Sequence, residues 1–380
     1  MRLVVGILRS TDKNIKENLT KLLDLLNYYP KKKKAFIKPN IVDALSPRSA
    51  VIVDPKVVKS LYECLKERGI KEIVIGEGTG FFTKPEHFAK VIKATKYDKI
   101  EKEFGIKVLN LEQEERIKVP WKYGELKLPK IIFDEEFEYI NLPKMKTHTL
   151  TTVTLALKNQ KGLLDLGSKR KFHKENLHDM ILELGKLVKP DLVILDAITA
   201  LEGSGPTENP QTLVKKMNLI LGAVGENANF EMDNVAAKIM GFNPQKIKHI
   251  VPVNYQLVGL PIDEVKSEFI KPKKMVEYGN LIHHMNEKTC TLCQIALSQT
   301  LRKINFKEEL RLKFEKIRDK YPRIDVIQGG GWESLPEGCV KEFCLGNCTK
   351  EFADRYGLIF CKGCPPHYNE IINFMLEEEN

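Results

Sequence analysis

Residues 54–75 read DPKVVKSLYECLKERGIKEIVI, and this stretch decides the fold class. Asp54 belongs to the residue types that favour an N-cap, and Pro55 is suited to the first helical position. Gly69 ends the amphipathic run in the way a C-cap glycine does. The four residues that close the stretch, EIVI, form a short apolar run typical of a strand. The stretch therefore predicts a helix over Pro55–Glu67 that leads into a strand.

The same alternation of short apolar runs and amphipathic stretches extends over about the first 260 residues. The predicted strands are Leu3–Leu8, Ala35–Lys38, Glu72–Ile75, Lys107–Leu109, Tyr139–Leu142, Leu192–Leu195 and Asn218–Leu221. The other predicted helices are Asn14–Leu26, Glu175–Val188 and Met232–Met240. Strand–helix–strand alternation predicts an α/β fold, with a mostly parallel sheet and helices on both faces. Ligands bind such sheets beyond the carboxyl ends of the strands.

The composition is that of a globular protein, because 42% of the 380 residues are hydrophobic and 29% are charged. The length exceeds the usual size of one domain. A composition shift near Ile270 predicts two units. We expect an α/β domain over 1–269 with a pocket for an anionic ligand, and a smaller cysteine-rich, cluster-binding region over 270–380.

Composition also argues against several classes of protein. No stretch approaches the roughly 20 apolar residues that span a bilayer, and the first residues become polar too early for a secretory signal. We therefore expect a cytoplasmic protein without a membrane partner. The net charge of +10 arises from 61 Lys and Arg mixed with 51 Asp and Glu. Since no nucleic-acid-binding signature accompanies this charge, nucleic acid is not the expected partner.

Seven of the eight cysteines lie in the C-terminal region, where they form closely spaced groups. The groups are Cys290-x2-Cys293, Cys339-x4-Cys344-x3-Cys348 and Cys361-x2-Cys364. Clustered cysteines in a cytosolic protein indicate metal ligands or redox groups before they indicate disulfides. The two neighbouring histidines, His283 and His284, are interpreted as surface or packing residues.

Local sequence favours four of these cysteines as ligands of one inorganic centre. A C-x2-C turn presents two thiolates together, which applies to Cys290 and Cys293. Cys364 precedes a proline, as the last ligand of bacterial ferredoxin clusters does. Cys348 follows a Gly-Asn turn whose glycine allows close approach of the backbone. We predict that these four hold an iron–sulfur cluster of the 4Fe-4S type.

Two alternatives to the cluster stay open. A structural zinc ion would use the two C-x2-C pairs, 290/293 and 361/364, and plain reduced thiols would bind no metal. Cys339, Cys344 and Cys361 are unassigned, as alternate ligands or redox partners. The C-x3-C-x2-C triplet of radical S-adenosylmethionine enzymes is absent, because Glu351 stands where its third cysteine would be.

Polar residues and glycines follow two strands of the predicted sheet. Lys38 ends the predicted strand 35–38 and Asn40 follows it, at the position where ligands bind in this fold class. Gly76 and Gly78 follow the strand 72–75, in a loop whose backbone N–H groups suit an anion. The alternatives are a structural role for the first pair and an ordinary tight turn for the glycines.

Two lysine-rich segments follow the strand Tyr139–Leu142. They hold Lys144, Lys146 and His148 in the first segment, and Lys158, Asn159 and Lys161 in the second. In an extended chain, period two places alternate residues on one face. We therefore predict a cationic pocket for phosphate or carboxylate groups. The alternative is a solvated basic loop.

Two carboxylates complete the set of candidate site residues. Asp196 ends the predicted strand Leu192–Leu195, and Glu202 follows in a Gly-Ser-Gly-Pro context. A carboxylate at the end of a strand suits a general base or a cation ligand. A capping or turn carboxylate is the alternative. The candidate catalytic residues are thus Lys144, Lys146, His148, Asp196 and Glu202.

Several segments resemble the bacterial and archaeal family called domain of unknown function 362. The matching segments are Phe36–Asn40, Ile75–Gly80, Asn141–His148, Leu155–Gly162, Asp196–Gly203 with Gly205-Pro206, and Asp233–Gly241. They cover most of residues 1–250. The resemblance implies an α/β fold and, as in many members, an iron–sulfur module. The C-terminal cysteines look like a variant form of that module, and the resemblance implies no reaction.

These features together predict an iron–sulfur protein that performs redox or electron-transfer chemistry coupled to a small anionic ligand. The partner would be that ligand or a redox partner protein. The alternative is a non-redox enzyme or binding protein with a structural zinc site. A metal-assisted racemase or isomerase is a third possibility that rests only on fold analogy. Whether the chain is an enzyme is left open.

Overall fold

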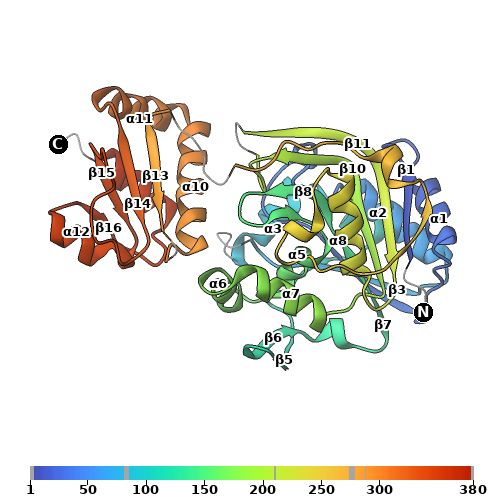
Figure 1. Cartoon of the computed structure of the whole chain (residues 1–380). Coiled ribbons are helices and arrows are strands. Elements are labelled where there is room, and N and C mark those ends of the chain that lie inside the picture. Colours follow the sequence, from blue (N-terminus) through green and yellow to red (C-terminus); the bar gives the residue numbers. More distant parts are fainter. Residues whose placement is uncertain (1–3, 81–84, 209–210, 274–278, 287, 378–380) are drawn as a thin grey trace. The chain divides into compact units, whose positions relative to one another are not determined.

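The computed structural model describes residues 4–80, 85–208, 211–273, 279–286 and 288–377. It divides into two compact units, coloured blue to yellow and orange to red in Figure 1. The first unit runs to Phe172 and from Asn176 to Lys273, and the second comprises His173–Glu175 and the chain from Lys274 onward.

The first unit is built on a ten-stranded sheet in the order β12-β1-β11-β10-β7-β2-β3-β4, with β8 and β9 beside this path. The strands are β1 (Val4–Arg9), β2 (Lys34–Pro39), β3 (Glu72–Glu77), β4 (Val108–Asn110), β7 (Phe137–Leu142), β8 (Lys144–His148), β9 (Thr152–Thr154), β10 (Leu192–Gly203), β11 (Thr212–Val224) and β12 (Gln256–Gly259). Neighbours run parallel except at β1–β11, β10–β11 and β8–β9. The prediction of a mostly parallel α/β sheet is confirmed.

The helices of this unit follow the strands along the chain. They are α1 (Ile15–Leu25), α2 (Pro55–Glu67), α3 (Phe88–Ala94), α4 (Tyr97–Phe104), α5 (Ala156–Asn159), α6 (Leu166–Lys174), α7 (Leu177–Leu187), α8 (Ala228–Ile239) and α9 (Ile262–Val265). A separate hairpin joins β5 (Arg116–Trp121) to β6 (Gly124–Pro129).

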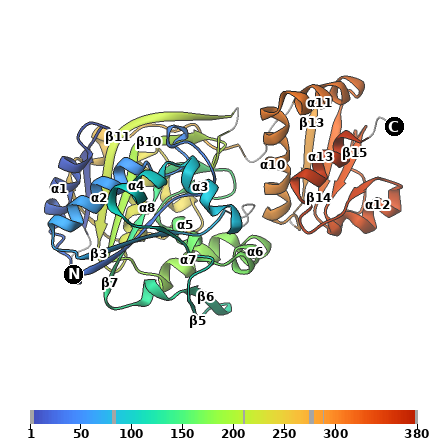
Figure 2. The ribbon, with the colours of Figure 1, turned by 180° about the vertical axis from the view of Figure 1, so that it is seen from behind.

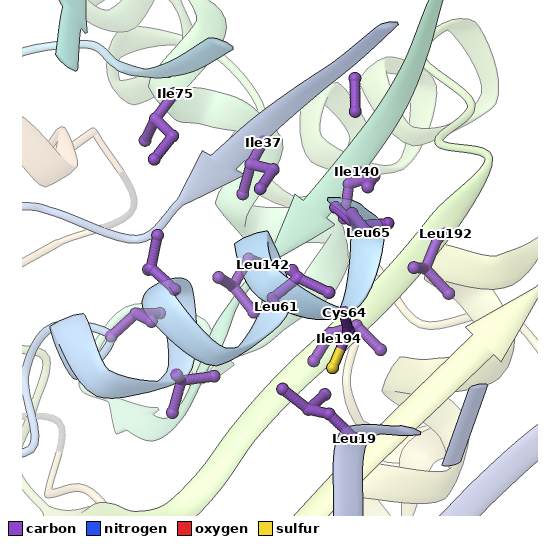
Figure 3. Close-up of a cluster of buried hydrophobic side chains, with 14 of the residues drawn as sticks. Leu19, Ile37, Leu61, Cys64, Leu65, Ile75, Ile140, Leu142, Leu192 and Ile194 are labelled. Atoms are coloured by element: carbon purple, nitrogen blue, oxygen red, sulfur yellow. The ribbon is translucent and has the colours of Figure 1, made fainter. Parts of the chain in front are cut away.

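Helices cover both faces of the large sheet (Figures 1 and 2). Along β10 the side chains alternate between the faces, as they do in any strand. Leu192 and Ile194 pack with α1 and α2 in a core that includes Cys64 (Figure 3). Val193 and Leu195 pack with α8 in a second core. A strand buried on both faces is continuously apolar, which explains why this one was predictable.

The main difference from the predicted elements concerns β10. Asp196 does not end the strand, because β10 continues to Gly203 by pairing with β11, with a register shift between Ala197 and Thr199. The glycine and proline residues after position 202 mark the true end. The helix α2 has the predicted bounds, and the Asp54 side chain accepts a hydrogen bond from Lys56 N at 2.9 Å.

The region predicted only as cysteine-rich is itself a small α/β unit. Four parallel strands lie in the order β13 (Leu281–Met285), β14 (Ile324–Gln328), β15 (Glu342–Leu345) and β16 (Phe360–Cys361). Its helices are α10 (Thr291–Phe306), α11 (Glu308–Lys320), α12 (Lys350–Tyr356) and α13 (Tyr368–Leu376). Among the described residues, no helix has the length and apolar character needed to cross a membrane.

The N-cap of α2 provides a test of the element that decides the fold. Asp54→Ala removes the side-chain acceptor for Lys56 N and should lower the free energy of unfolding by about 1 kcal/mol. Lys56→Ala is the matched control, because only the backbone of Lys56 takes part in the cap. Chemical denaturation of the full chain measures both. Equal effects of the two substitutions would contradict the capping role.

Candidate functional site

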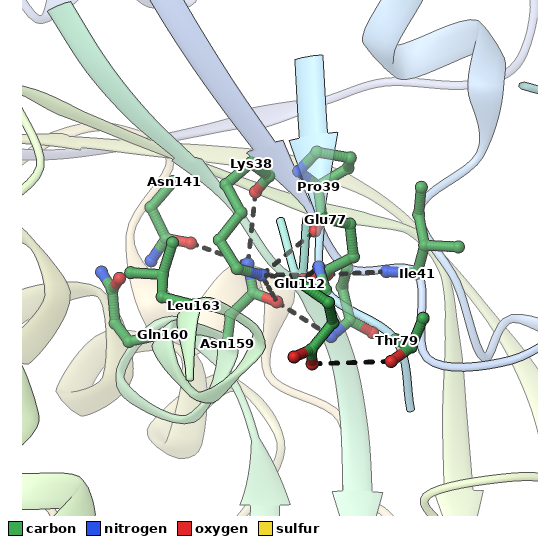
Figure 4. Close-up of polar contacts among 12 residues, drawn as sticks. Lys38, Pro39, Ile41, Glu77, Thr79, Glu112, Asn141, Asn159, Gln160 and Leu163 are labelled. Carbon is green, nitrogen blue, oxygen red and sulfur yellow. Dashed lines mark hydrogen bonds and ion pairs between the residues drawn. The ribbon is translucent and has the colours of Figure 1, made fainter. Parts of the chain in front are cut away.

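A buried ion pair lies at the carboxyl ends of β2 and β3 (Figure 4). Lys38 Nζ donates to Glu77 Oε2 at 2.9 Å, and the two side chains are 0% and 4% exposed. The backbone N–H groups of Ile41 and Gly78 also donate to the Glu77 carboxylate, at 3.1 and 2.9 Å. Burial lowers the pKa of Lys38, and Glu77 opposes this shift. Lys38 was predicted as a ligand residue, and the structure places it in this internal pair.

Two glycines allow the backbone to approach this ion pair. A Cβ atom on Gly162 would lie 2.0 Å from Glu77 Oε1 and 2.5 Å from Lys38 Nζ. A Cβ atom on Gly78 would lie 2.2 Å from the carbonyl oxygen of Gly162. Gly76 packs inside the sheet, where a Cβ atom would meet Leu111 and Phe36 at 3.0 Å. Gly76 and Gly78 therefore allow close packing, a role that was not predicted for them from the sequence.

Three asparagines extend the network from the ion pair. Asn159 Oδ1 accepts hydrogen bonds from Lys38 Nζ at 3.2 Å and from Asn40 Nδ2 at 2.9 Å. Asn159 Nδ2 donates to Asn141 Oδ1 at 2.7 Å. Asn40 and Asn159 were both predicted site residues, and the structure brings them together. Asn141 was missed, although an amide within an apolar strand is a signal for a buried hydrogen bond.

A second buried ion pair joins β8 to β10. Lys144 Nζ lies 2.8 Å from Asp196 Oδ2, and both side chains are fully buried. Asp196 also accepts a hydrogen bond from Asp54 N at 3.0 Å. The sequence predicted Lys144 in a cationic pocket and Asp196 at a strand end. In the structure the two side chains form an ion pair inside the sheet and neutralise each other. Glu202 is held similarly, by Lys215 Nζ and by Ile270 N, each at 3.1 Å.

Lys146 is fully buried, and its amine contacts neutral oxygen atoms. Its Nζ donates to Asn40 Oδ1 at 2.9 Å and to Val51 O at 2.7 Å. Burial and the nearby Lys144 lower the pKa of Lys146 to about 7. The amine therefore changes its charge near neutral pH, where an ordinary lysine stays protonated.

In the second lysine-rich segment Lys158 and Asn159 are buried and Lys161 is half-buried, so neither segment is the solvated loop considered as the alternative. Lys158 Nζ donates to Thr151 Oγ1 at 2.9 Å, and burial holds its pKa well below the usual range. Burial, with Lys169 nearby, lowers the pKa of Lys161 to about 7. His148 Nδ1 accepts from Leu150 N at 3.0 Å.

The buried amines outnumber the carboxylates paired with them among the described residues. Lys38, Lys144 and Lys169 each have a carboxylate partner, and the last pairs with Glu112 at 2.6 Å. Lys146 and Lys158 are held by neutral oxygens. A buried charge without a counter-ion is costly, so such a group either loses its proton or gains an anion. Lys169 was missed because its segment, KRK, has the composition of a solvated helix face.

The second unit gathers thiols at the carboxyl edge of its sheet. Cys290 is the N-cap residue of α10 and Cys293 lies in its first turn. The Cys293 sulfur forms side-chain hydrogen bonds with Cys290 and with Cys348. These hydrogen bonds lower the pKa of Cys290 and of Cys348 to about 6, and they raise the pKa of Cys293. A Cβ atom on Gly346 would lie 3.2 Å from Cys293 Sγ and 3.6 Å from Cys348 Sγ. Three of the four predicted ligands therefore converge in a glycine-lined space.

The other cysteines of this unit occupy different environments. Cys364 is exposed, and its neighbour Gly363 is joined to the Cys348 turn by two hydrogen bonds of 2.8 Å with Asn347. Cys361 belongs to β16 and is 5% exposed. Cys344 is a core residue. Cys339 lies beside Asp325. Burial and the negative charge of Asp325 together raise the pKa of the Cys339 thiol to about 11.

Comparison with known proteins gives a family match, one partial relative and one partial structural alignment. The family model described as "Domain of unknown function (DUF362)" matches residues 36–237. The thylakoid-associated protein sll1697 of Synechocystis sp. is 27% identical over 215 residues, which are 53% of this chain and 65% of that protein. The match thus covers less than two thirds of that relative. A crystal structure of a Thermotoga maritima protein aligns over 55% of each chain, at 20% identity and a TM-score of 0.33.

The close approach of Gly162 to the Lys38–Glu77 pair can be tested by adding one methyl group. Gly162→Ala places a Cβ atom within the ion pair and should lower the free energy of unfolding by about 3 kcal/mol. Gly167→Ala is the control, because its Cβ atom meets nothing closer than 3.4 Å and alanine favours a helix. Thermal and chemical unfolding measure both variants. A Gly162→Ala protein as stable as the control would refute the packing described above.

Proposed function

We propose, for a chain that belongs to the DUF362 family, the function of an iron–sulfur redox protein whose α/β unit binds a small anion. The observation that carries the first part is the convergence of Cys290, Cys293 and Cys348 at one edge of a parallel sheet. The second part rests on the buried Lys146 and Lys158, whose amines donate to neutral oxygen atoms.

Four thiolates would hold the cluster: Cys290, Cys293, Cys348 and Cys364. The first two share one turn at the N-terminus of α10, a position that favours negative charge. Two hydrogen bonds between Asn347 and Gly363, one of them accepted by the Asn347 side chain, join the turns that carry the two remaining ligands. When bound, a cluster of this kind supplies one-electron transfer. Cys348 and Cys364 are exposed, which leaves that edge accessible to a redox partner.

The same geometry makes the paired C-x2-C zinc site the weaker alternative. That site needs Cys361 in place of Cys348. Cys361 is part of β16, its carbonyl accepts a hydrogen bond from Gly346 N, and its side chain is buried. The sulfur of Cys348, by contrast, already lies against that of Cys293.

We place the proposed anion site at the residues around Lys146 in the α/β unit. Asn40, His148 and Lys158 are between 6% and 8% exposed, whereas Lys146 is fully buried. Burial holds the pKa of Lys158 well below its usual range, and repulsion from the nearby Lys161 and Lys146 lowers it further. A phosphate, sulfate or carboxylate group would relieve this repulsion, which is why we assign a small oxyanion or carboxylate to the site.

The cluster assignment predicts different outcomes for two cysteines that are close in sequence. Protein prepared without oxygen should be brown and contain iron and sulfide. Cys348→Ser should lose the iron and the visible absorption, because it removes one ligand. Cys344→Ala should retain both, because Cys344 is a buried core residue. Colourless protein with one zinc per chain that survives Cys348→Ser would refute the proposal.

The anion site predicts binding that depends on pH. Lys146 is neutral above its pKa of about 7 and charged below it, so sulfate, whose own charge is constant here, should bind about tenfold more tightly at pH 6 than at pH 8. Lys146→Met should bind weakly and without this dependence. Lys118→Met is the control, since that lysine is exposed. Isothermal titration calorimetry of the full chain gives the affinities. An unchanged pH profile in Lys146→Met would exclude Lys146 from the site.

A further inference from the structure

A second group of metal-ligating side chains in the C-terminal unit consists of residues other than the four predicted cluster ligands. His284 on β13, Asp325 on β14 and Cys339 each offer one ligand atom, and these atoms all lie within 4.8 Å of one another. Among the described residues, no other group of three or more His, Cys, Asp or Glu side chains has its ligand atoms this close together. The sequence had suggested packing for His284 and left Cys339 unassigned.

We propose that His284, Asp325 and Cys339 form a binding site for a divalent ion of the zinc type. Imidazole nitrogen, carboxylate oxygen and thiolate sulfur are the ligands that zinc takes in proteins. Ligand atoms on one tetrahedral zinc ion are about 3.5 Å apart, as follows from zinc–ligand bonds of about 2.0–2.3 Å. The His284 Nε2 to Asp325 Oδ1 distance of 2.7 Å therefore has to open by less than about 1 Å. The fourth position is left to water.

The register of the sheet fixes two of the three ligands on one face. Asp325 pairs with Ile282 across β13–β14, and His284 lies two residues beyond Ile282. Since side chains alternate along a strand, His284 and Asp325 point to the same side. His283 points to the other side, where its Nε2 contacts Gln328 Oε1 at 2.7 Å. Adjacent histidines thus have different partners.

The third ligand comes from the connection between β14 and β15. Residues 329–341 form this crossover without any helix or strand, although parallel neighbours are usually joined through a helix. Val340 N donates to Asp325 Oδ2 at 3.0 Å, which holds Cys339 beside the sheet. Long connections of this kind generally need an anchor or a function. A metal ion shared by the strands and Cys339 supplies such an anchor.

The local charge balance also fits a divalent cation. Arg323 Nε donates to Asp325 Oδ1 at 2.7 Å, and Glu342 lies near Cys339. With the thiol protonated, the two carboxylates outweigh the guanidinium by one negative charge. A divalent ion with a deprotonated Cys339 makes the sum zero. Arg323 Nη2 lies 3.3 Å from His284 Nε2 and has to withdraw, which its 25% exposed side chain permits.

Zinc binding to the full chain tests this site independently of the proposed cluster. Cobalt or zinc is titrated into protein prepared without oxygen, and iron is assayed in parallel. We expect one equivalent of zinc, and with cobalt a thiolate-to-metal absorption band. Cys339→Ser and His284→Gln should each lose this equivalent and keep the iron. Cys344→Ala, a neighbour in β15, should keep both.

Hydrogen exchange gives a second readout that does not depend on stoichiometry. Zinc should slow exchange of the backbone amides in residues 331–341 of the native chain and leave them unchanged in His284→Gln. That variant keeps Cys339 and its loop, so it separates ligation from misfolding. Zinc that remains after both substitutions, or that is lost with Cys290→Ser instead, would overturn the assignment. Loss of iron alone would count against the cluster and leave this site standing.

Discussion

The ion pair between Lys38 and Glu77 is the constraint around which the carboxyl edge of the large sheet is arranged. Moving an ammonium and a carboxylate out of water is costly, and the attraction between them offsets the cost only when other groups satisfy their remaining hydrogen-bonding positions. Here those groups are backbone N–H groups and the side chain of Asn159. The glycines at 78 and 162 follow from the same requirement, since a Cβ atom on Gly162 would overlap the pair and one on Gly78 would overlap the backbone of Gly162.

Much of the fold follows from local signals, each of which lies within one short stretch of the chain. The N-cap, the proline and the glycine around α2 are local signals, and the helix has the predicted bounds. Strands buried on both faces, such as β10, were visible as apolar runs, although the length of β10 was not. Its last residues are held by pairing with β11 and β8, which are separated from it in sequence.

The sequence identified several residues of the candidate site, but it did not reveal which partner each of them contacts. Lys38, Asn40, Lys146 and Asn159 do meet, as their positions after strands suggested. Lys144 was assigned to a cationic pocket and Asp196 to a strand end, because neither segment reveals that the two side chains form an ion pair. The same holds for His284 and Cys339, whose proximity depends on the register of β13 against β14 and on a connection without regular structure.

The lysine network joins residues that are far apart along the chain. Lys38 and Asn159 are separated by 121 positions, Asn40 and Lys146 by 106, and Lys144 and Asp196 by 52. None of these contacts can form until the strands that carry them have met. A sheet assembled in another order or register would bury the same amines without partners, which is strongly unfavourable. The network therefore favours one arrangement of the strands during assembly. Only that arrangement gives the buried amines their partners, so compact alternatives are less stable.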